Sequence, residues 1–522
     1  MAALEYAAAA ETDTDVDLLR RATEVTAQCL QPSLTVGVAS RWIQVDPAAV
    51  DAHRAAARAA LELHKIEQSA AHFRVVLTAS PRGTDAEFAA LETELATTAN
   101  IYGARQLADR IAGYFPASQA ALRMQAFAAL RADDPAAAVR TFTAALAMPA
   151  LATPAGTPPG EPSSVEAGRR ELTQGLWRAR ILAGEMDEPL AQAKALLERD
   201  DTAENRLDYA LVLLAAQQHS AARAQLAMLA REPEAKPVAL RLLGLIEFQE
   251  GKLDDASARF AELVTTGKFL DDALYYLGLI AERHGDMDRA LRLYAQVQGG
   301  ENAVPALLRA ATVLRANGAA PAADELLDQL AIEEPQRAPE ILAARARIYA
   351  DAGELPRAIA VLDQGELQYP DSVELRYAMA SMSEEQGKIA AALNELKAVA
   401  ALRPADPAAL NAYGYTLADN NRKLRVARKL IEQAYAAAPK NPAILDSLGW
   451  VLFRQGHGDQ ALPYLNAAYA DDHGGDIAAH LGEVLWRLGR RADADRIWSE
   501  ASRVGEDNHL LKATRLRLHA SN

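Results

Sequence analysis

Apolar side chains recur along the chain at the three- and four-residue spacing of amphipathic helices, and small residues recur with a longer period of about 34 residues. One set of positions returns one period later, as Gly244-x11-Ala256-x3-Phe260-x2-Leu263 and then Gly278-x11-Ala290-x3-Tyr294-x2-Val297. The position held by Ala256 and Ala290 recurs along the whole chain, and we call the residues at this position anchors. Successive anchors are 33–35 residues apart, with one exception: Thr35, Ser69, Ala104, Ala138, Pro189, Ala222, Ala256, Ala290, Ala323, Ala358, Ala392, Ala427, Ala461 and Ala494.

This period predicts two helices in every repeat. A small residue in the first helix and the anchor in the second let the two backbones approach closely. Glycine then ends many first helices, since it suits the left-handed residue after a helix C-terminus, at Gly184, Gly251, Gly285, Gly318, Gly353, Gly387, Gly456 and Gly489. Asp406-Pro407 and Asn441-Pro442 are typical of an N-cap followed by proline in the first helical turn. The pattern predicts an all-α tetratricopeptide-repeat solenoid of about 13–14 helix pairs.

The period is interrupted once, where Ala138 and Pro189 lie 51 residues apart. The surplus, residues 148–164, contains five prolines and two glycines, so it is predicted to be a mobile loop. It is either a tolerated insertion or a hinge or clamp on a partner. We therefore expect an N-terminal extension (1–14), an N-terminal repeat block (15–147), the loop (148–164), a C-terminal block (165–503) and a capping helix (504–522).

Charge and composition argue against several classes of partner and site. The 522 residues carry a formal net charge of −15, which repels phosphate backbones and argues against a nucleic-acid partner. Cys29 is the single cysteine, so it can form neither an internal disulfide nor a cysteine zinc site. No apolar run reaches the roughly 20 residues of a membrane span, and the first residues lack the pattern of an export signal. We expect a cytosolic protein, or one whose export segment is missing from this sequence.

Catalytic motifs do not emerge from the sequence. The stretch 456–461 matches the G-x-G-x-x-A nucleotide motif, but it follows a predicted helix, whereas the motif requires a strand. His480 and Glu483 share one helical face, and a metal site would need further ligands beside them. We therefore expect no enzymatic activity, no cofactor and no metal, and regard an enzyme or enzyme subunit as the weakest of three hypotheses.

The first helices of a stacked-pair solenoid line its concave face. In the last three repeats this face is predicted to combine aromatic and charged side chains, the residue types that anchor interfaces. The candidate protein-binding residues are Asn411, Tyr415, Asp419, Asp446, Trp450, Phe453, Arg454, Glu483, Trp486 and Arg487. The competing interpretation is that some of these aromatics pack between helices, as is expected of Trp498.

Three segments in these repeats carry a more specific likeness. Residues 410–419, 444–451 and 477–486 have the sequences LNAYGYTLAD, ILDSLGWV and IAAHLGEVLW. Over about residues 405–500 the chain resembles the tetratricopeptide lipoproteins of the Gram-negative outer membrane. That resemblance implies a non-enzymatic adaptor at the periplasmic face, which binds a carboxyl-terminal processing protease and presents cell-wall hydrolases to it. The membrane would be reached only through a lipid anchor that this sequence does not contain.

The leading hypothesis is therefore a protease-binding adaptor that uses its concave surface. The alternative is a cytosolic peptide-binding co-chaperone or complex-assembly factor that uses the same groove. The segment that precedes the repeats in the encoded protein would separate the two, because the adaptor needs an export signal and a lipid-modified cysteine.

Overall fold

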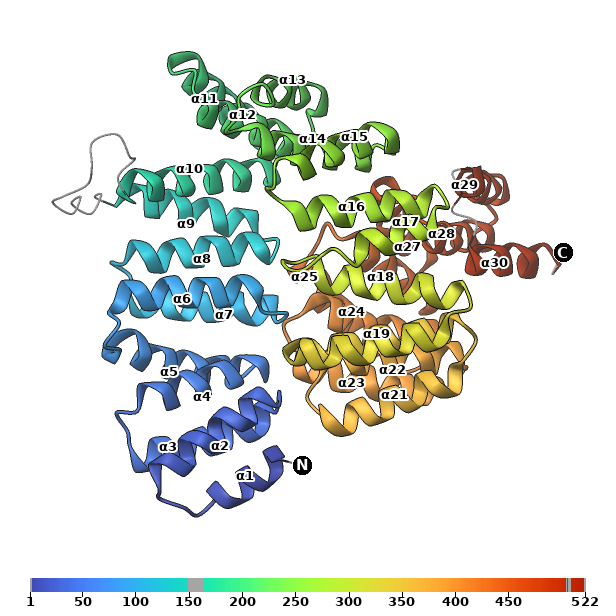
Figure 1. Cartoon of the computed structure of the whole chain (residues 1–522). Coiled ribbons are helices and arrows are strands. Elements are labelled where there is room, and N and C mark those ends of the chain that lie inside the picture. Colours follow the sequence, from blue (N-terminus) through green and yellow to red (C-terminus); the bar gives the residue numbers. More distant parts are fainter. Residues whose placement is uncertain (1, 149–163, 504, 506–507, 521–522) are drawn as a thin grey trace. The chain divides into compact units, whose positions relative to one another are not determined.

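A computed structural model of the chain describes residues 2–148, 164–503, 505 and 508–520. Within these residues the secondary structure is helical, with 30 α-helices, one short 3-10 helix and no β-strand (Figure 1). Most helices are of nearly equal length and alternate with short turns, as the two helices of each predicted repeat require. The predicted loop, apart from Met148 and Ser164 at its ends, lies outside the described residues.

The helices before the loop are α1 Ala2–Ala10, α2 Val16–Gln28, α3 Pro32–Val45, α4 Val50–Glu62, α5 Ile66–Ala79, α6 Thr84–Thr97, α7 Ile101–Tyr114, α8 Gln119–Arg131 and α9 Pro135–Ala147. The next group is α10 Ser164–Leu182, α11 Asp187–Arg199, α12 Ala203–Ala215, α13 His219–Leu229, α14 Lys236–Gln249, α15 Leu253–Thr265, α16 Leu270–Arg283, α17 Met287–Tyr294, α18 Ala303–Ala316, α19 Ala320–Glu333, η1 Pro335–Arg337, α20 Ala338–Asp351 and α21 Leu355–Gln368. The last group is α22 Val373–Glu385, α23 Ile389–Leu402, α24 Pro407–Asp419, α25 Leu424–Ala437, α26 Pro442–Arg454, α27 Gly458–Asp471, α28 Gly475–Arg487, α29 Arg491–Arg503 and α30 His509–Ala520.

The anchors predicted from the sequence lie in the second helix of each pair, from Thr35 in α3 to Ala494 in α29. All fourteen are buried. The small residue of the first helix meets a large side chain of the second: a Cβ added at Gly278 would lie 2.4 Å from the ring of Tyr294. The predicted close approach of paired helices is confirmed, because a side chain at such a glycine would displace the neighbouring helix.

The turns form as the local sequence predicts. The eight predicted turn glycines all have a positive φ between 70° and 92°, a conformation that residues with a Cβ adopt only under strain. The turn between α24 and α25 differs, because Asn421 takes the left-handed conformation there with φ 53°. The predicted caps also form, since the side chain of Asp406 accepts a hydrogen bond from Ala408 N and that of Asn441 from Ala443 N.

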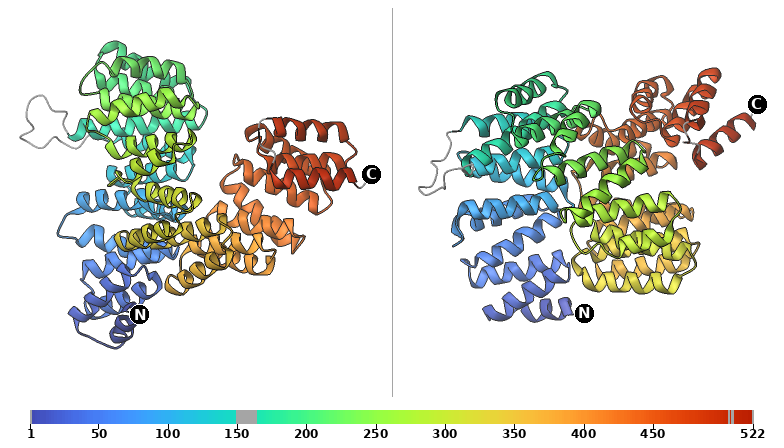
Figure 2. Two further views of the ribbon diagram at one scale, coloured as in Figure 1. Left: turned by 45° about the vertical axis from the view of Figure 1, so that its right-hand side comes forward. Right: turned by 45° about the horizontal axis from the view of Figure 1, so that its top comes forward.

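The chain divides into two compact units. One consists of Met1–Ala60 and Ile66–Tyr369, and the other of Leu61–Lys65 and Pro370–Asn522. In the first, most helices pack against the next helix in sequence (Figure 2). Small hydrophobic clusters therefore follow one another along this unit. α1 lies within the predicted N-terminal extension. The division into an N-terminal and a C-terminal repeat block at residues 148–164 stays a prediction. The described helices include none with the length and apolar character of a bilayer span.

The second unit carries the largest described core cluster. It runs through α23–α30 and is closed by α30, which packs along α28 and buries Leu511 and Leu518. This helix lies where the sequence predicts a capping helix, and it covers apolar surface that would otherwise face water. All of the candidate protein-binding residues belong to this unit.

Candidate protein-binding surface of the C-terminal repeats

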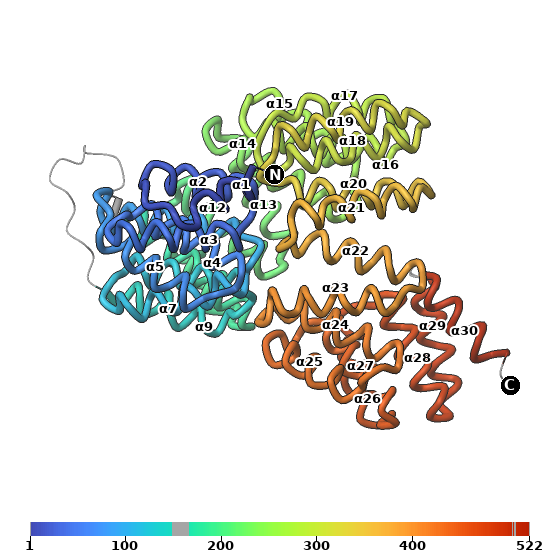
Figure 3. The backbone as a smooth tube through the Cα atoms, turned by 90° about the horizontal axis from the view of Figure 1, so that it is seen from below, coloured from blue at the N-terminus to red at the C-terminus, as the bar shows by residue number. Residues whose placement is uncertain are grey.

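Three consecutive first helices, α24, α26 and α28, carry the candidate residues. α26 packs against both α24 and α28 (Figure 3). Stacking brings equivalent positions of successive repeats next to one another. Contacts between these equivalent positions therefore decide which of the predicted residues remain accessible.

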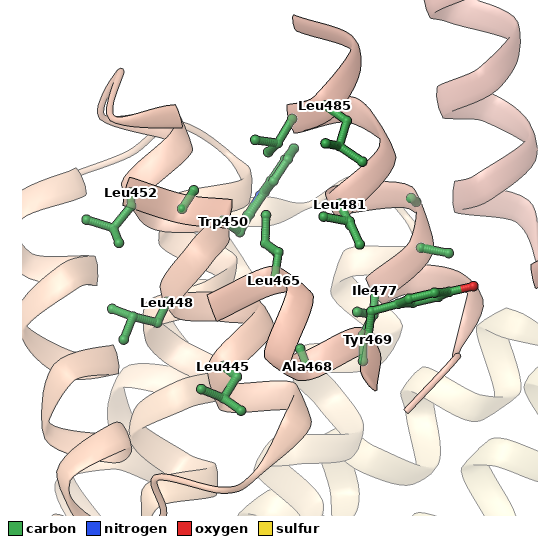
Figure 4. Packing of buried hydrophobic residues seen from close by; sticks show 14 of the residues in the cluster. Leu445, Leu448, Trp450, Leu452, Leu465, Ala468, Tyr469, Ile477, Leu481 and Leu485 are labelled. Atoms are coloured by element: carbon green, nitrogen blue, oxygen red, sulfur yellow. The ribbon is translucent and has the colours of Figure 1, made fainter. Parts of the chain in front are cut away.

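Trp450 lies inside the core of this unit. Its side chain points between α26 and α28, near Leu465 and Leu481 (Figure 4), and only 4 % of the residue is exposed. Its indole Nε1 donates a hydrogen bond of 3.2 Å to Asp419 Oδ1. Of the two interpretations that the sequence leaves open, packing between helices agrees with the burial of Trp450, whose one polar atom is satisfied.

A buried imidazole–carboxylate pair stands next to this tryptophan. His480 Nδ1 lies 2.8 Å from Asp446 Oδ2, and the imidazole stacks on Trp450 with 4.1 Å between ring centroids. Burial lowers the pKa of His480, but the surrounding carboxylates, with Asp446 foremost through its charge and its hydrogen bond, together raise that pKa above the ordinary value near 6.5. Asp419 and Asp476 contribute in the same direction. A protonated His480 therefore forms a buried ion pair that links α26 to α28.

Tyr415 and Asn411, both half-buried, complete the polar layer on α24. The Tyr415 ring lies 5.8 Å from the imidazole of His480, centroid to centroid. Burial raises the pKa of Tyr415 well above its usual range, and the carboxylates of Asp419 and Asp446 reinforce that shift, so the phenol stays neutral. Asn411 Oδ1, Asp446 Oδ1 and His480 Nε2 are buried and have no hydrogen-bond partner among the described residues.

The last repeat shows the same kind of arrangement with a different ion pair. Glu483 is buried and accepts two hydrogen bonds from Arg517 of α30, at 3.0 and 2.5 Å. Trp486 is 9 % exposed and packs among Trp498 and His519, with ring centroids 5.7 and 4.6 Å away. The capping helix thus helps to bury two residues that the sequence pattern predicts on an open face.

What stays accessible is a polar rim at the C-terminal ends of these helices. Asp419 and Arg487 are exposed, and Phe453 and Arg454 are half-buried. Arg454 Nη1 donates a hydrogen bond of 2.8 Å to Asp419 O, while its guanidinium lies 5.5 Å from the Trp450 ring. Such a rim provides charged contacts for a partner above a well-packed core. That any of the ten residues contacts a partner stays a prediction.

Two residues important to this face are absent from the predicted site. These are His480 and Arg517, which the ten candidate residues do not include although each pairs with one of them. Each lies 34 residues after its carboxylate partner, Asp446 and Glu483. Such residues could be found in a sequence by looking, one repeat after each carboxylate, for an oppositely charged or hydrogen-bonding side chain. Within the described residues no cluster of three or more histidine, cysteine or acidic side chains is arranged to hold a metal ion.

Comparison with known proteins agrees with the repeat assignment. Tetratricopeptide-repeat family models match residues 241–303, 339–382, 377–442, 416–477 and 447–502. A TPR repeat-containing protein of Pseudomonas aeruginosa is 37% identical over 214 residues, which are 41% of this chain and 36% of that protein. The match thus spans little more than a third of the relative's length.

Solved structures of tetratricopeptide-repeat proteins are also similar. A thermophilic TPR protein of Thermus thermophilus has 18% identity and a TM-score of 0.31, covering 35% of this chain and 97% of that one. A tetratricopeptide repeat protein of Parabacteroides merdae has 13% identity and a TM-score of 0.34, with coverages of 54% and 98%. The paired helices with their buried anchors, together with the repeat matches, show that the fold is an all-α solenoid of tetratricopeptide-type repeats.

Proposed function

We propose that the chain is a protein-binding scaffold without catalytic activity of its own, and that its C-terminal unit holds a partner protein. The observation that carries this proposal is the polar rim at the ends of α24, α26 and α28, which sits on a core of buried ion pairs and aromatic contacts. A rim fixed in this way can bind without first being ordered, which lowers the entropic cost of association.

The partner we propose is a carboxyl-terminal processing protease, together with its cell-wall hydrolase substrates, at the periplasmic face of the outer membrane. The resemblance of residues 410–419, 444–451 and 477–486 to the outer-membrane tetratricopeptide lipoproteins supports this choice. Those three segments fall on α24, α26 and α28, and α26 packs against the other two. Holding protease and substrate on one scaffold raises their effective concentration, so cleavage would become nearly intramolecular.

The test uses the full chain with the purified protease and hydrolase of the same cell. Calorimetry measures binding of the protease, and electrophoresis follows cleavage of the hydrolase with and without the chain. We expect saturable binding and a cleavage rate that rises by about tenfold or more, since tethering commonly gains at least this factor. Arg487→Glu should weaken binding, whereas Lys440→Glu, an exposed position in another turn, should not.

Two results would contradict the proposal. Absence of binding together with an unchanged cleavage rate would exclude the adaptor function for this protease. Cleavage of the hydrolase by the chain alone would exclude a non-enzymatic scaffold.

A further inference from the structure

A cluster of cations marks the turn into α25, in a chain whose overall charge is strongly negative. Residues 422–429 contain five basic side chains, Arg422, Lys423, Arg425, Arg428 and Lys429, and no acidic one, against a net charge of −15 for the whole chain. The positive end of the α25 helix dipole adds to their charge. Folding alone would favour acidic residues in this first turn, so the cations at this position are unfavourable to the isolated helix.

Three of these five cations line an open pocket of about 530 Å³ between α25 and the end of α26. Arg425, Arg428 and Lys429 contribute from α25, while Arg454 and His457 contribute from the end of α26 and the turn after it. The size falls in the range of pockets that hold a small ligand or a few side chains. Glu432 is the one acidic residue in the lining.

Hydrogen bonds hold part of the pocket in place. Arg428 Nε donates to Glu432 Oε1 at 2.7 Å, which offsets the negative charge of that carboxylate. Gln455 joins the two helices, because its side chain donates to Leu424 O at 3.1 Å and accepts from Arg428 at 3.4 Å. Arg454 is held by the carbonyl of Asp419. The backbone framework of the pocket is therefore fixed by contacts within the unit.

Two cations of the lining have no counter-charge. Arg425 and Lys429 are exposed and make no ion pair or side-chain hydrogen bond with any residue in the described part of the chain. Their charges are therefore available to a ligand, and no existing ion pair needs to be broken first. The pocket presents these two cations beside Arg454, whose guanidinium is partly exposed.

We propose that this pocket binds an acidic peptide segment, rich in glutamate or aspartate, of a protein partner. The inference rests on the proposed scaffold function and names the chemistry of one contact. A short acidic segment responds mainly to the local positive charge, because interactions beyond about 10 Å are screened at ordinary ionic strength. A long polyanion such as nucleic acid would meet the net negative charge of the remaining surface as well. Val426, the exposed residue that follows Arg425 in α25, also offers apolar contact that a peptide can use.

Fluorescence anisotropy of a labelled hexaglutamate peptide with the full chain tests the proposal, and a hexaglutamine peptide is the neutral probe. We expect hexaglutamate to bind and hexaglutamine not to bind, with affinity falling as salt is raised because exposed charges are screened. Arg425→Glu with Lys429→Glu should raise the Kd for hexaglutamate by about tenfold or more, since each attraction becomes a repulsion.

Lys397→Glu with Lys440→Glu is the matched control. It makes the same change in net charge at two exposed residues outside the pocket lining, so the Kd should change by less than about twofold. Thermal melting of each variant checks that it folds, which we expect because all four side chains are exposed.

Four results would overturn the proposal: no binding of hexaglutamate, equal binding of both peptides, equal loss in both double variants, or tighter binding of an oligonucleotide or of anionic lipid vesicles than of hexaglutamate. Failure here is distinguishable from failure of the scaffold function. If the processing protease binds the wild-type chain while hexaglutamate does not, the pocket assignment fails and the scaffold function stands. If hexaglutamate binds specifically and no protease does, the pocket stands and the proposed partner fails.

Discussion

Replacing Trp450 by alanine separates packing from recognition at the candidate surface. The side chain is 4 % exposed and stacks on His480, and its indole nitrogen is bonded to Asp419. Truncation would open a cavity beside the Asp446–His480 pair and remove that hydrogen bond. Replacing a buried aromatic residue by alanine costs about 3–5 kcal/mol of folding stability, and Trp450 is buried to the same degree as such core residues.

The expected shift in melting temperature follows from the size of the unit. The second unit comprises Leu61–Lys65 and Pro370–Asn522, and in domains of about 150–250 residues each kcal/mol lowers the midpoint by about 2–4 °C. We therefore expect its unfolding transition to fall by about 6–20 °C. Because a solenoid unfolds through nearest-neighbour contacts, the loss should be confined largely to repeats near Trp450.

Calorimetry and chemical denaturation of the full chain measure this effect, and titration with the partner protease measures affinity on the same sample. Leu516→Ala in α30 is the control, because Leu516 is 74 % exposed and its loss should change stability by less than about 0.5 kcal/mol. An unchanged melting curve in Trp450→Ala, with partner affinity lost, would show that the tryptophan acts in recognition and that its burial contributes little to stability.

Three further predictions concern buried charges and close helix contacts. The pKa of His480 is raised in the folded state by its neighbouring carboxylates. Its stabilising contribution is therefore complete below about pH 6.5 and is lost as pH rises through the folded pKa. Chemical denaturation at several pH values should show this fall in the free energy of unfolding for the wild type and not for His480→Gln. The hydrogen-bonded Arg54 guanidinium lowers the pKa of Glu87 to about 2 from 4.5. The first unit should therefore lose roughly 3 kcal/mol of folding stability as pH falls from about 5 to about 2. Denaturation of Glu87→Gln over the same pH range should not show that loss. Gly482→Ala would place a Cβ 1.9 Å from the Trp498 indole nitrogen, which should cost about 1–3 kcal/mol, whereas Gly113→Ala, with nothing within 4 Å of the added atom, should stabilise its helix by about 1 kcal/mol in the same thermal melts.

The fold could be predicted from the sequence to an unusual depth, because each repeat is specified by residues close together in the chain. The buried anchor Ala461, the close contact at Gly278 and the positive-φ turn at Gly456 all follow from spacing alone. Helix boundaries follow from caps such as Asp406. These features concern one helix or one pair, for which local propensity and periodicity carry most of the information.

The candidate site could be predicted only in part. The sequence places Tyr415, Trp450 and Trp486 on the first helices of successive repeats, and the structure confirms their positions on α24, α26 and α28. The sequence does not determine their exposure, because an aromatic on a first helix can face the groove or the next repeat. Burial of Trp450 depends on α28, and burial of Trp486 depends on α29 and α30.

The sequence by itself thus determined the repeat, its helix pairs, its turns and the small residues at which helices meet, since all of these depend on contacts within a single repeat. Only the tertiary structure decided which charges are neutralised and which remain available. Stacking pairs Asp446 with His480 and Glu483 with Arg517 across one repeat, while Arg425 and Lys429 are left without a counter-charge among the described residues at a pocket edge. The physical reason is that the attraction between two charges depends on the distance between the helices that carry them, which a linear pattern of polar and apolar residues does not contain.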